Sequence, residues 1–447
     1  MIPIFKKLLR SNESLSLISN LMVAAFGFLG FMFLARTFTK DVFGEWLLYL
    51  ITAGLIEMLR FAITKVSIIR FLSGSEGEER KQLIGSNWFL GLLLTVILII
   101  IIYAIKFLFP DWVQASDYNY FFTWYPLLSI LNLPYNNALG LLQAKQDFKS
   151  MLIIKFISKG LFFLFILVNF LFLNLGVQEV IYAHLAVNLI TSLLSIFKGW
   201  DGMSYIFKAS KANISKLFHF GKFTIGTMIG SNLLKSADTM LIGFSPLGPA
   251  YVALYSVPLK LTEIMEIPLR SFLATAFPKM SKASIKNDPE TVKNVFYTYS
   301  GALTLLFIPI AIVCIIFAKY FILILGGAQY YEASEPIILF QIFAIYGLFL
   351  PIDRFTGVAL DSINKPKKNF YKVILMVVLN IIGDLVALFV FKSIVMVALV
   401  TILFTIAGQI VGFRYLNKEI PVNYPDIFKC GFNFYKDLYT QNLKKKS

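Results

Sequence analysis

Six basic side chains lie inside long apolar stretches of the sequence: Arg60, Lys159, Lys235, Lys260, Arg270 and Arg354. A charge at the centre of a bilayer costs about 2.5–3.5 kcal/mol on insertion scales, so charges kept there usually face a cavity or a partner. A guanidinium group binds phosphate oxygens two at a time and stays charged when it is desolvated. We therefore predict that an anionic, phosphate-bearing group binds at Arg60, Arg270 and Arg354, with Lys260 and Lys235 contributing.

Acidic residues accompany these cations at helical spacing. Four acid–base pairs stand three or four residues apart: Glu57–Arg60, Lys235–Asp238, Lys260–Glu263 and Glu266–Arg270. Residues at this spacing share one face of a helix and can form ion pairs. For each charge two interpretations stay open, a structural ion pair or a functional group, and a lysine such as Lys159 can also extend to the membrane surface.

Three carboxylates in the apolar stretches are candidates for binding a coupling cation: Glu57, Glu263 and Asp384. A carboxylate shielded from water can exchange a proton near neutral pH unless a basic group stays paired with it. A coupling H⁺ or Na⁺, if one is used, is therefore expected at one of these three positions.

One apolar stretch is rich in aromatic and amide side chains. It contains Trp124, Tyr125, Asn132, Tyr135, Asn136 and Asn137, interrupted by Pro126 and Pro134. Aromatic faces and amides are the groups that bind sugars, by stacking and by hydrogen bonds to hydroxyls. The alternative is an aromatic belt at the membrane surface with amides that join helices. We predict sugar contacts for Asn132, Asn136 and Asn137.

Motifs for catalysis or for ATP hydrolysis are missing from the sequence. It has no glycine-rich phosphate loop followed by Lys-Ser or Lys-Thr. The two histidines, His184 and His219, stand far apart, and Cys314 and Cys430 have no metal-binding spacing. We expect no enzyme activity, no cofactor and no metal site.

The elements that carry these residues must lie in lipid. Of the 447 residues, 58% are hydrophobic and 15% charged, whereas a soluble domain is about 45–50% apolar and about 25% charged. Apolar runs of roughly 20 residues match the thickness of a bilayer. Because the runs do not alternate, they indicate helices and exclude a barrel. The pattern predicts an all-α polytopic membrane protein with twelve transmembrane helices at residues 15–37, 43–65, 85–108, 118–143, 150–173, 178–198, 217–243, 249–275, 293–317, 334–360, 367–391 and 394–416.

The distribution of Lys and Arg predicts the topology. With both termini in the cytoplasm, 30 of the 41 basic residues fall on the cytoplasmic side, five in outside loops and six within helices. Cytoplasmic loops carry such an excess. The net charge of +16 is therefore explained by topology, and we expect no nucleic acid partner.

The sequence divides into two halves. We predict a six-helix lobe at 1–200, a cytoplasmic linker at 201–216, a second six-helix lobe at 217–416 and a basic cytoplasmic tail at 417–447. A shift of 206 residues pairs Tyr49 with Tyr255 and Glu57 with Glu263. Two such halves would be related by a pseudo-two-fold axis, with the substrate path between them near the midplane.

Several short segments resemble the polysaccharide flippases of the O-antigen type, in the multidrug/oligosaccharidyl-lipid/polysaccharide exporter superfamily. They are Asn20–Arg36 followed by Phe43-Gly44-Glu45-Trp46, Gly140–Lys145 with Phe148-Lys149, Asn232 and Asp238 with Ile242-Gly243, Tyr251–Tyr255, Pro268–Arg270, Phe277-Pro278 and Gly357–Lys368. The resemblance covers essentially the whole chain, but none of these segments is a catalytic signature.

The resemblance implies a V-shaped bundle with a central cationic cavity and alternating access, in a bacterial inner membrane. Its substrate would be an oligosaccharide linked to undecaprenyl diphosphate, and its partners would include membrane lipids and polysaccharide polymerase machinery. The related peptidoglycan-precursor flippases carry essential arginines on the first, second and eighth helices, for which Arg60 and Arg270 are the counterparts here; the first helix has no deep arginine. Two alternatives stay open: an ion-coupled multidrug exporter of the same fold, and a membrane enzyme of envelope-glycan assembly.

Overall fold

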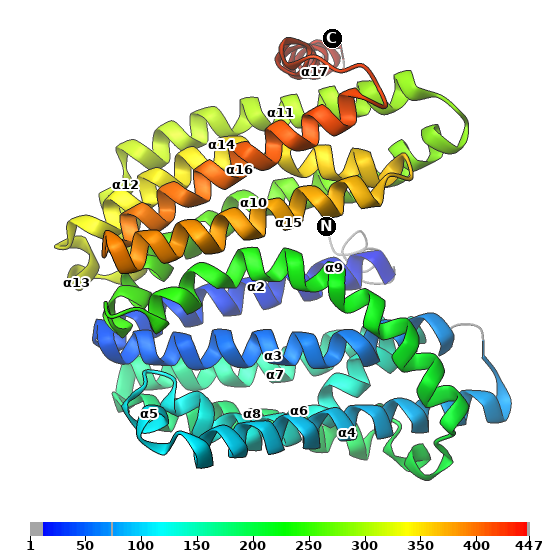
Figure 1. Ribbon diagram of the computed structural model, residues 1–447, viewed down its shortest axis with the longest axis vertical. Helices are drawn as coiled ribbons and strands as arrows, with labels where there is room; N and C mark the ends of the chain where they lie inside the picture. The colour runs from blue at the N-terminus through cyan, green and yellow to red at the C-terminus, as the bar shows by residue number, and fades with distance from the viewer. Residues whose placement is uncertain (1–11, 73–74, 445–447) are drawn as a thin grey trace. The chain divides into compact units, whose positions relative to one another are not determined.

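The computed structural model describes the backbone of residues 12–72 and 75–444, and within it the side chains other than those of residues 12–17, 221–233, 235, 438 and 441–444. These described residues form helices joined by short turns and contain no β-strand (Figure 1). The all-α prediction is confirmed. Helices satisfy every backbone hydrogen bond within one segment, which lipid requires.

The first half of the chain forms six long helices, one short helix and two irregular turns. Their bounds are α2 Asn12–Thr37, α3 Lys40–Leu72, α4 Gly77–Leu108, α5 Pro110–Ala115, α6 Asn119–Ala144, α7 Phe148–Val168, the π-turn η1 Asn169–Leu173, α8 Val177–Phe197 and the 3₁₀ turn η2 Met203–Lys208. Each of the six segments predicted from the sequence coincides with one of the long helices.

The second half repeats this order of six long helices and ends in a further one. The bounds are α9 Lys211–Phe244, α10 Pro249–Ile285, α11 Pro289–Ile316, α12 Ala318–Gly326, α13 Ala328–Tyr331, α14 Ser334–Ser362, α15 Pro366–Leu385, the π-turn η3 Val386–Val390, α16 Ile394–Asn417 and α17 Tyr424–Lys444. All six predicted segments are again found, and α17 lies in the region predicted as a tail.

Nine helices of the described ranges are long and apolar enough to cross a membrane: α2 from Ile18, α3, α4, α7 with η1, α8, α11, α14, α15 with η3, and α16. This supports a multi-pass membrane protein. The other three predicted spans, α6, α9 and α10, are more polar, since they carry the amides and the charged pairs that the sequence singles out. Twelve spans therefore stay a prediction.

The chain folds into two compact units, Met1–Asn232 and Leu233–Ser447, which divide inside α9. The segment predicted as the inter-lobe linker packs on α4 of the first unit. Trp88 Nε1 donates to the carbonyl of Asp201 at 2.7 Å, and Ser210 N donates to Ser86 Oγ at 3.0 Å. Gly85 is needed at this crossing because a Cβ there would lie 2.1 Å from the carbonyl oxygen of Tyr205. The lobe and linker bounds read from the sequence stay predictions.

Candidate functional site

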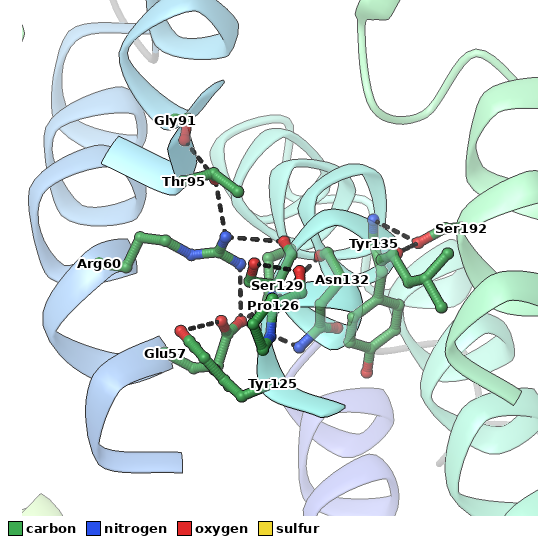
Figure 2. A network of polar contacts seen from close by, with 12 residues as sticks. Glu57, Arg60, Gly91, Thr95, Tyr125, Pro126, Ser129, Asn132, Tyr135 and Ser192 are labelled. Atoms are coloured by element: carbon green, nitrogen blue, oxygen red, sulfur yellow. Dashed lines mark hydrogen bonds and ion pairs between the residues drawn. The ribbon is translucent and has the colours of Figure 1, made fainter. Parts of the chain in front are cut away.

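The first unit contains a buried ion pair between Glu57 and Arg60, one turn apart on α3. Arg60 Nη2 lies 2.8 Å from Glu57 Oε2, and the Arg60 side chain is fully buried. Its other terminal nitrogen donates to Thr95 Oγ1 of α4 and to the carbonyl oxygen of Ser129 on α6, both at 2.7 Å. Three helices therefore meet at this guanidinium group (Figure 2).

Glu57 accepts further hydrogen bonds from α6. Tyr125 Oη donates to Oε1 at 2.8 Å, and Asn132 Nδ2 donates to Oε2 at 3.0 Å. Asn136 Nδ2 reaches the same Oε2 at 3.4 Å. Two of the asparagines predicted to bind sugar thus hold the Glu57 carboxylate in this structure. Asn137 instead accepts a hydrogen bond from Asn87 of α4 at 3.1 Å.

A side chain of α8 contacts the backbone of α6 where these residues lie. The hydroxyl of Ser192, on α8, donates to the carbonyl of Leu131 and accepts from the amide of Tyr135 at 3.2 Å. That carbonyl and that amide stand four residues apart and would bond each other in a regular helix. Pro134 lies between them and has no N–H to donate. A hydroxyl group bound to the helix backbone and a proline are both known causes of a helix kink, so a bend of α6 is expected beside Glu57.

The second unit contains a different buried cluster, with two aspartates. Asn380 of α15 donates to Asp238 of α9 and to Asp384 of α15, both at 3.0 Å. Asp238 also accepts from Tyr255 Oη at 2.5 Å and from Thr401 Oγ1 at 3.2 Å. Asp384 lies on α15, one of the helices able to span a membrane, and is completely buried.

Two oxygens of this cluster have no hydrogen-bond partner: Asp384 Oδ1 and Asn380 Oδ1. A buried oxygen without a donor costs about 1–3 kcal/mol, so a cation or a proton at this place would be favourable. Na⁺ and H⁺ both suit oxygen ligands from carboxylates and amides. Asp384, a predicted coupling residue, therefore lies in a cluster with unpartnered oxygens.

A third cluster gathers the two predicted arginines of the second unit. Arg270 of α10 pairs with Glu266 one turn before it, and its side chain is 66% exposed. Arg354 of α14 interacts with the charges of Glu266 and Asp353. Asp353 is itself paired with Lys372 of α15 at 2.7 Å, and both of these side chains are buried. These five groups carry three positive and two negative charges, and Asp361, which interacts with Lys372, adds a third negative charge.

The remaining predicted residues are placed as follows. Lys260 Nζ pairs with Glu263 Oε2 at 2.7 Å on α10, and the Glu263 side chain is 56% exposed. Glu263 therefore differs from its repeat partner Glu57, which is deeply buried. The side chain of Lys235 lies outside the described residues.

Sequence reasoning missed several members of these clusters. Lys372 stands near the start of the predicted helix 367–391, where a lysine is expected to extend to the membrane surface. Asn380, Thr401 and Ser192 are small polar residues without any local signal. Asp238 is paired with Lys235 by its spacing in the sequence and not with residues of other helices. Among the described residues, no three His, Cys, Asp or Glu side chains are grouped so that they could hold a metal ion.

Comparison with known proteins gives the family and the fold. Residues 33–335 match the model of a family described as polysaccharide biosynthesis protein. A relative from Haloferax volcanii, described as probable low-salt glycan biosynthesis flippase Agl15, is 24% identical over 251 residues. That match covers 56% of this chain and 52% of the relative, so it spans about half the length of that protein.

Solved structures with this fold include two kinds of transporter. The lipid II flippase MurJ in its inward closed conformation is similar with a TM-score of 0.71 and 16% identity, over 96% of this chain and 92% of that one. An inward-facing transporter of the multidrug resistance MATE family, of the MOP superfamily, has a TM-score of 0.72 and 15% identity, over 89% of this chain and 94% of that one. The resemblance inferred from the sequence is confirmed, and the chain shares its fold with the MurJ and MATE transporters. Because the family model matches two thirds of its length, this chain belongs to the polysaccharide biosynthesis protein family.

Proposed function

We propose that this protein is a flippase that moves a lipid-linked oligosaccharide across a bacterial inner membrane, from the cytoplasmic to the outer leaflet, by alternating access. The proposed cargo is an oligosaccharide on undecaprenyl diphosphate, and it crosses without chemical change. Family membership and the glycan flippase described for the Haloferax relative support transport of this class.

The observation that carries the proposal is that two arginines, Arg270 and Arg354, both lie within electrostatic range of Glu266. Arg270 pairs with this carboxylate and is largely exposed, and Arg354 interacts with its charge. Each guanidinium group has several donors, which fit the oxygens of a diphosphate. The exposed guanidinium group of Arg270 disfavours a cationic drug as cargo, because like charges repel.

We further propose that the cluster of Asp238, Asn380 and Asp384 couples transport to Na⁺ or H⁺. Its two unpartnered oxygens supply the reason. Glu57 is the weaker candidate because Arg60 neutralises it, and Glu263 is weaker still because it is exposed beside Lys260.

A binding measurement separates this proposal from the drug-exporter alternative. Purified protein is titrated with undecaprenyl diphosphate and, separately, with a cationic dye, using Arg270→Ala, Arg354→Ala and Arg270→Lys. Loss of a charged hydrogen bond costs about 1.5–3 kcal/mol, so each alanine variant should bind the lipid about tenfold more weakly or worse. Arg270→Lys keeps the charge but loses the paired hydrogen bonds of a guanidinium group, so its affinity for the lipid should lie between those of the unaltered protein and Arg270→Ala.

Arg414→Ala is the matched control, since this arginine is exposed in the last turn of α16 and outside the cluster. It should bind the lipid as the unaltered protein does. Preferential binding of the dye, or lipid affinity that is unchanged in both alanine variants, would remove the proposal.

A further inference from the structure

The helix α17 is fixed against α11 by a close backbone crossing. A Cβ on Gly301 of α11 would lie 1.9 Å from the carbonyl oxygen of Ile427, and a Cβ on Gly431 would lie 2.4 Å from the carbonyl carbon of Gly301. Tyr435 Oη donates to the carbonyl of Ala302 at 2.9 Å. Such an approach requires glycine on both helices, so α17 packs on α11 in one defined position.

The crossing point lies where the apolar part of α11 begins. Residues 289–300 of α11 contain Glu290, Lys293, Tyr297 and Tyr299, whereas residues 301–316 contain no charged residue. The change from polar to apolar sequence marks the membrane surface. In Figure 1, α17 is seen nearly end-on while α11 and α16 run across the view, so α17 crosses them steeply. A helix at this level and in this direction lies along the membrane surface.

One face of α17 that does not contact α11 is aromatic. Phe428, Phe432 and Tyr439 are 43%, 67% and 68% exposed. Their spacing of four and seven residues places them on one side of the helix. The face toward α11 is different and contains Ile427 and Gly431.

Two lysines border the aromatic face. Lys429 directly follows Phe428, and Lys436 lies between Phe432 and Tyr439 in the sequence. Both lysines are exposed, and they stand seven residues apart. Asn433 and Thr440 continue the polar side. Aromatic residues beside lysines are typical of helices that lie in the headgroup region, where rings enter the acyl boundary and ammonium groups bind anionic lipids.

We propose that α17 is a membrane-surface helix whose Phe428, Phe432 and Tyr439 side chains insert into the leaflet on the lysine-rich side, and whose Lys429 and Lys436 bind anionic lipid headgroups. The occupant of the exposed aromatic face is thus lipid. The crossing at Gly301 holds the helix at the depth where this insertion is possible.

Nitroxide accessibility in the full chain tests the proposal. Cys314 and Cys430 are replaced by serine, and a spin label is placed at Phe432→Cys or, as the matched control on the adjacent polar side, at Asn433→Cys. The protein is reconstituted in phosphatidylcholine vesicles with or without phosphatidylglycerol. With the anionic lipid, the label at 432 should collide with oxygen more than with a water-soluble nickel complex, and the label at 433 should do the reverse.

Neutralising the lysines tests the second half of the proposal. Each lysine near an anionic surface is worth about 1 kcal/mol, so Lys429→Gln and Lys436→Gln should each weaken the binding of phosphatidylglycerol at α17 about fivefold. Labels at 432 and 433 that are equally open to the nickel complex would overturn the proposal. A label at 432 that is shielded from both relaxants would do so as well, because it would show that protein covers this face.

Discussion

Arg60 is a fully buried cation whose charge is balanced within one helical turn. Glu57 neutralises it, while Thr95 and Ser129 bind the same guanidinium group from two other helices. Removing one partner of a buried ion pair costs about 3–5 kcal/mol because the other charge stays behind, whereas removing both is far less harmful. The pair therefore serves first to join α3, α4 and α6.

Substitution of this pair should show that pattern. Arg60→Met leaves Glu57 without its counter-charge and should lower stability by about 3–5 kcal/mol. The double variant Glu57→Gln, Arg60→Met should recover at least half of the loss. Thermal unfolding in detergent, followed by circular dichroism, measures both. A double variant no more stable than Arg60→Met would contradict the structural role of the pair.

The aspartate cluster predicts a response to cations. Unaltered protein should melt at a higher temperature when Na⁺ replaces K⁺, or when the pH is lowered if H⁺ is the ligand, because a ligand of the folded state stabilises it. Asp384→Asn should lose that response, since it removes the charge beside the unpartnered oxygens. Glu263→Gln, an exposed carboxylate on α10, is the control and should keep it. An equal response in Asp384→Asn would exclude this cluster as the cation site.

The ion pairs could be predicted from local spacing and the clusters could not. Glu57–Arg60, Lys260–Glu263 and Glu266–Arg270 stand three or four residues apart and are observed as pairs. Asp238 and Asn380 are separated by 142 residues, so their hydrogen bond depends on how α9 and α15 pack. Spacing along one helix carries no information about such a partner.

At the scale of elements, α6 is the helix whose geometry depends most on a neighbour. The Ser192 hydroxyl of α8 hydrogen-bonds both the carbonyl of Leu131 and the amide of Tyr135. The sequence showed the two prolines of α6 and not the serine that contacts its backbone.

Ser192→Ala should therefore disturb the backbone of α6 more than the loss of one hydroxyl group alone suggests. It removes a donor and an acceptor from buried backbone groups, at a cost of about 1–3 kcal/mol. The kink around Pro134 should also become less defined, which spin-label distances along α6 would report as a broader distribution. Ser195→Ala, whose hydroxyl bonds only the carbonyl of Thr191 in its own helix, is the control. Equal effects of the two variants would remove the special role of Ser192.

A second contact between elements joins the start of α15 to the end of α16. Hydrogen bonds from Lys368 and Lys365 lower the pKa of Glu419, which lies outside the membrane-spanning helices. Because the pKa is lowered in the folded state, this contribution is complete above the usual glutamate pKa of about 4.3 and is lost as the pH falls through the lower value.

Glu419→Gln should therefore reduce stability by less than about 1 kcal/mol near neutral pH, since the group is partly exposed to solvent. The difference from the unaltered protein should stay constant down to about pH 5 and disappear only once the pH falls below the lowered pKa of Glu419. Thermal melting across pH measures it, and a difference that rises toward acid would contradict the assignment.

At the scale of the whole molecule, the twelve long helices predicted from apolar runs are all present, and the family match agrees with the resemblance read from short motifs. The apolar length of a run is a property of a single segment, which explains why the helices could be predicted. The repeat was only partly informative. Tyr49 and Tyr255 are both buried and each binds an ionisable side chain, His184 and Asp238, whereas Glu57 and Glu263 lie in opposite surroundings.

The topology can be tested by labelling from outside the cell. Cysteine placed at Ser116, between α5 and α6, should react with an impermeant reagent, because this loop is predicted to face outward. Cysteine at Ser284, near the end of α10, should react only after the membrane is opened. The opposite pattern would reverse the predicted orientation.

The most direct test of the account is a flipping assay in proteoliposomes. A fluorescent oligosaccharide linked to undecaprenyl diphosphate is placed in both leaflets, and a reagent that cannot cross the membrane quenches only the outer one. Unaltered protein should bring the inner pool out, so that quenching becomes nearly complete, while Arg270→Ala combined with Arg354→Ala should leave it as protected as in protein-free vesicles. An inner pool that stays protected from quenching with the unaltered protein, or that is quenched equally with the double variant, would contradict a flippase that binds its substrate through these arginines.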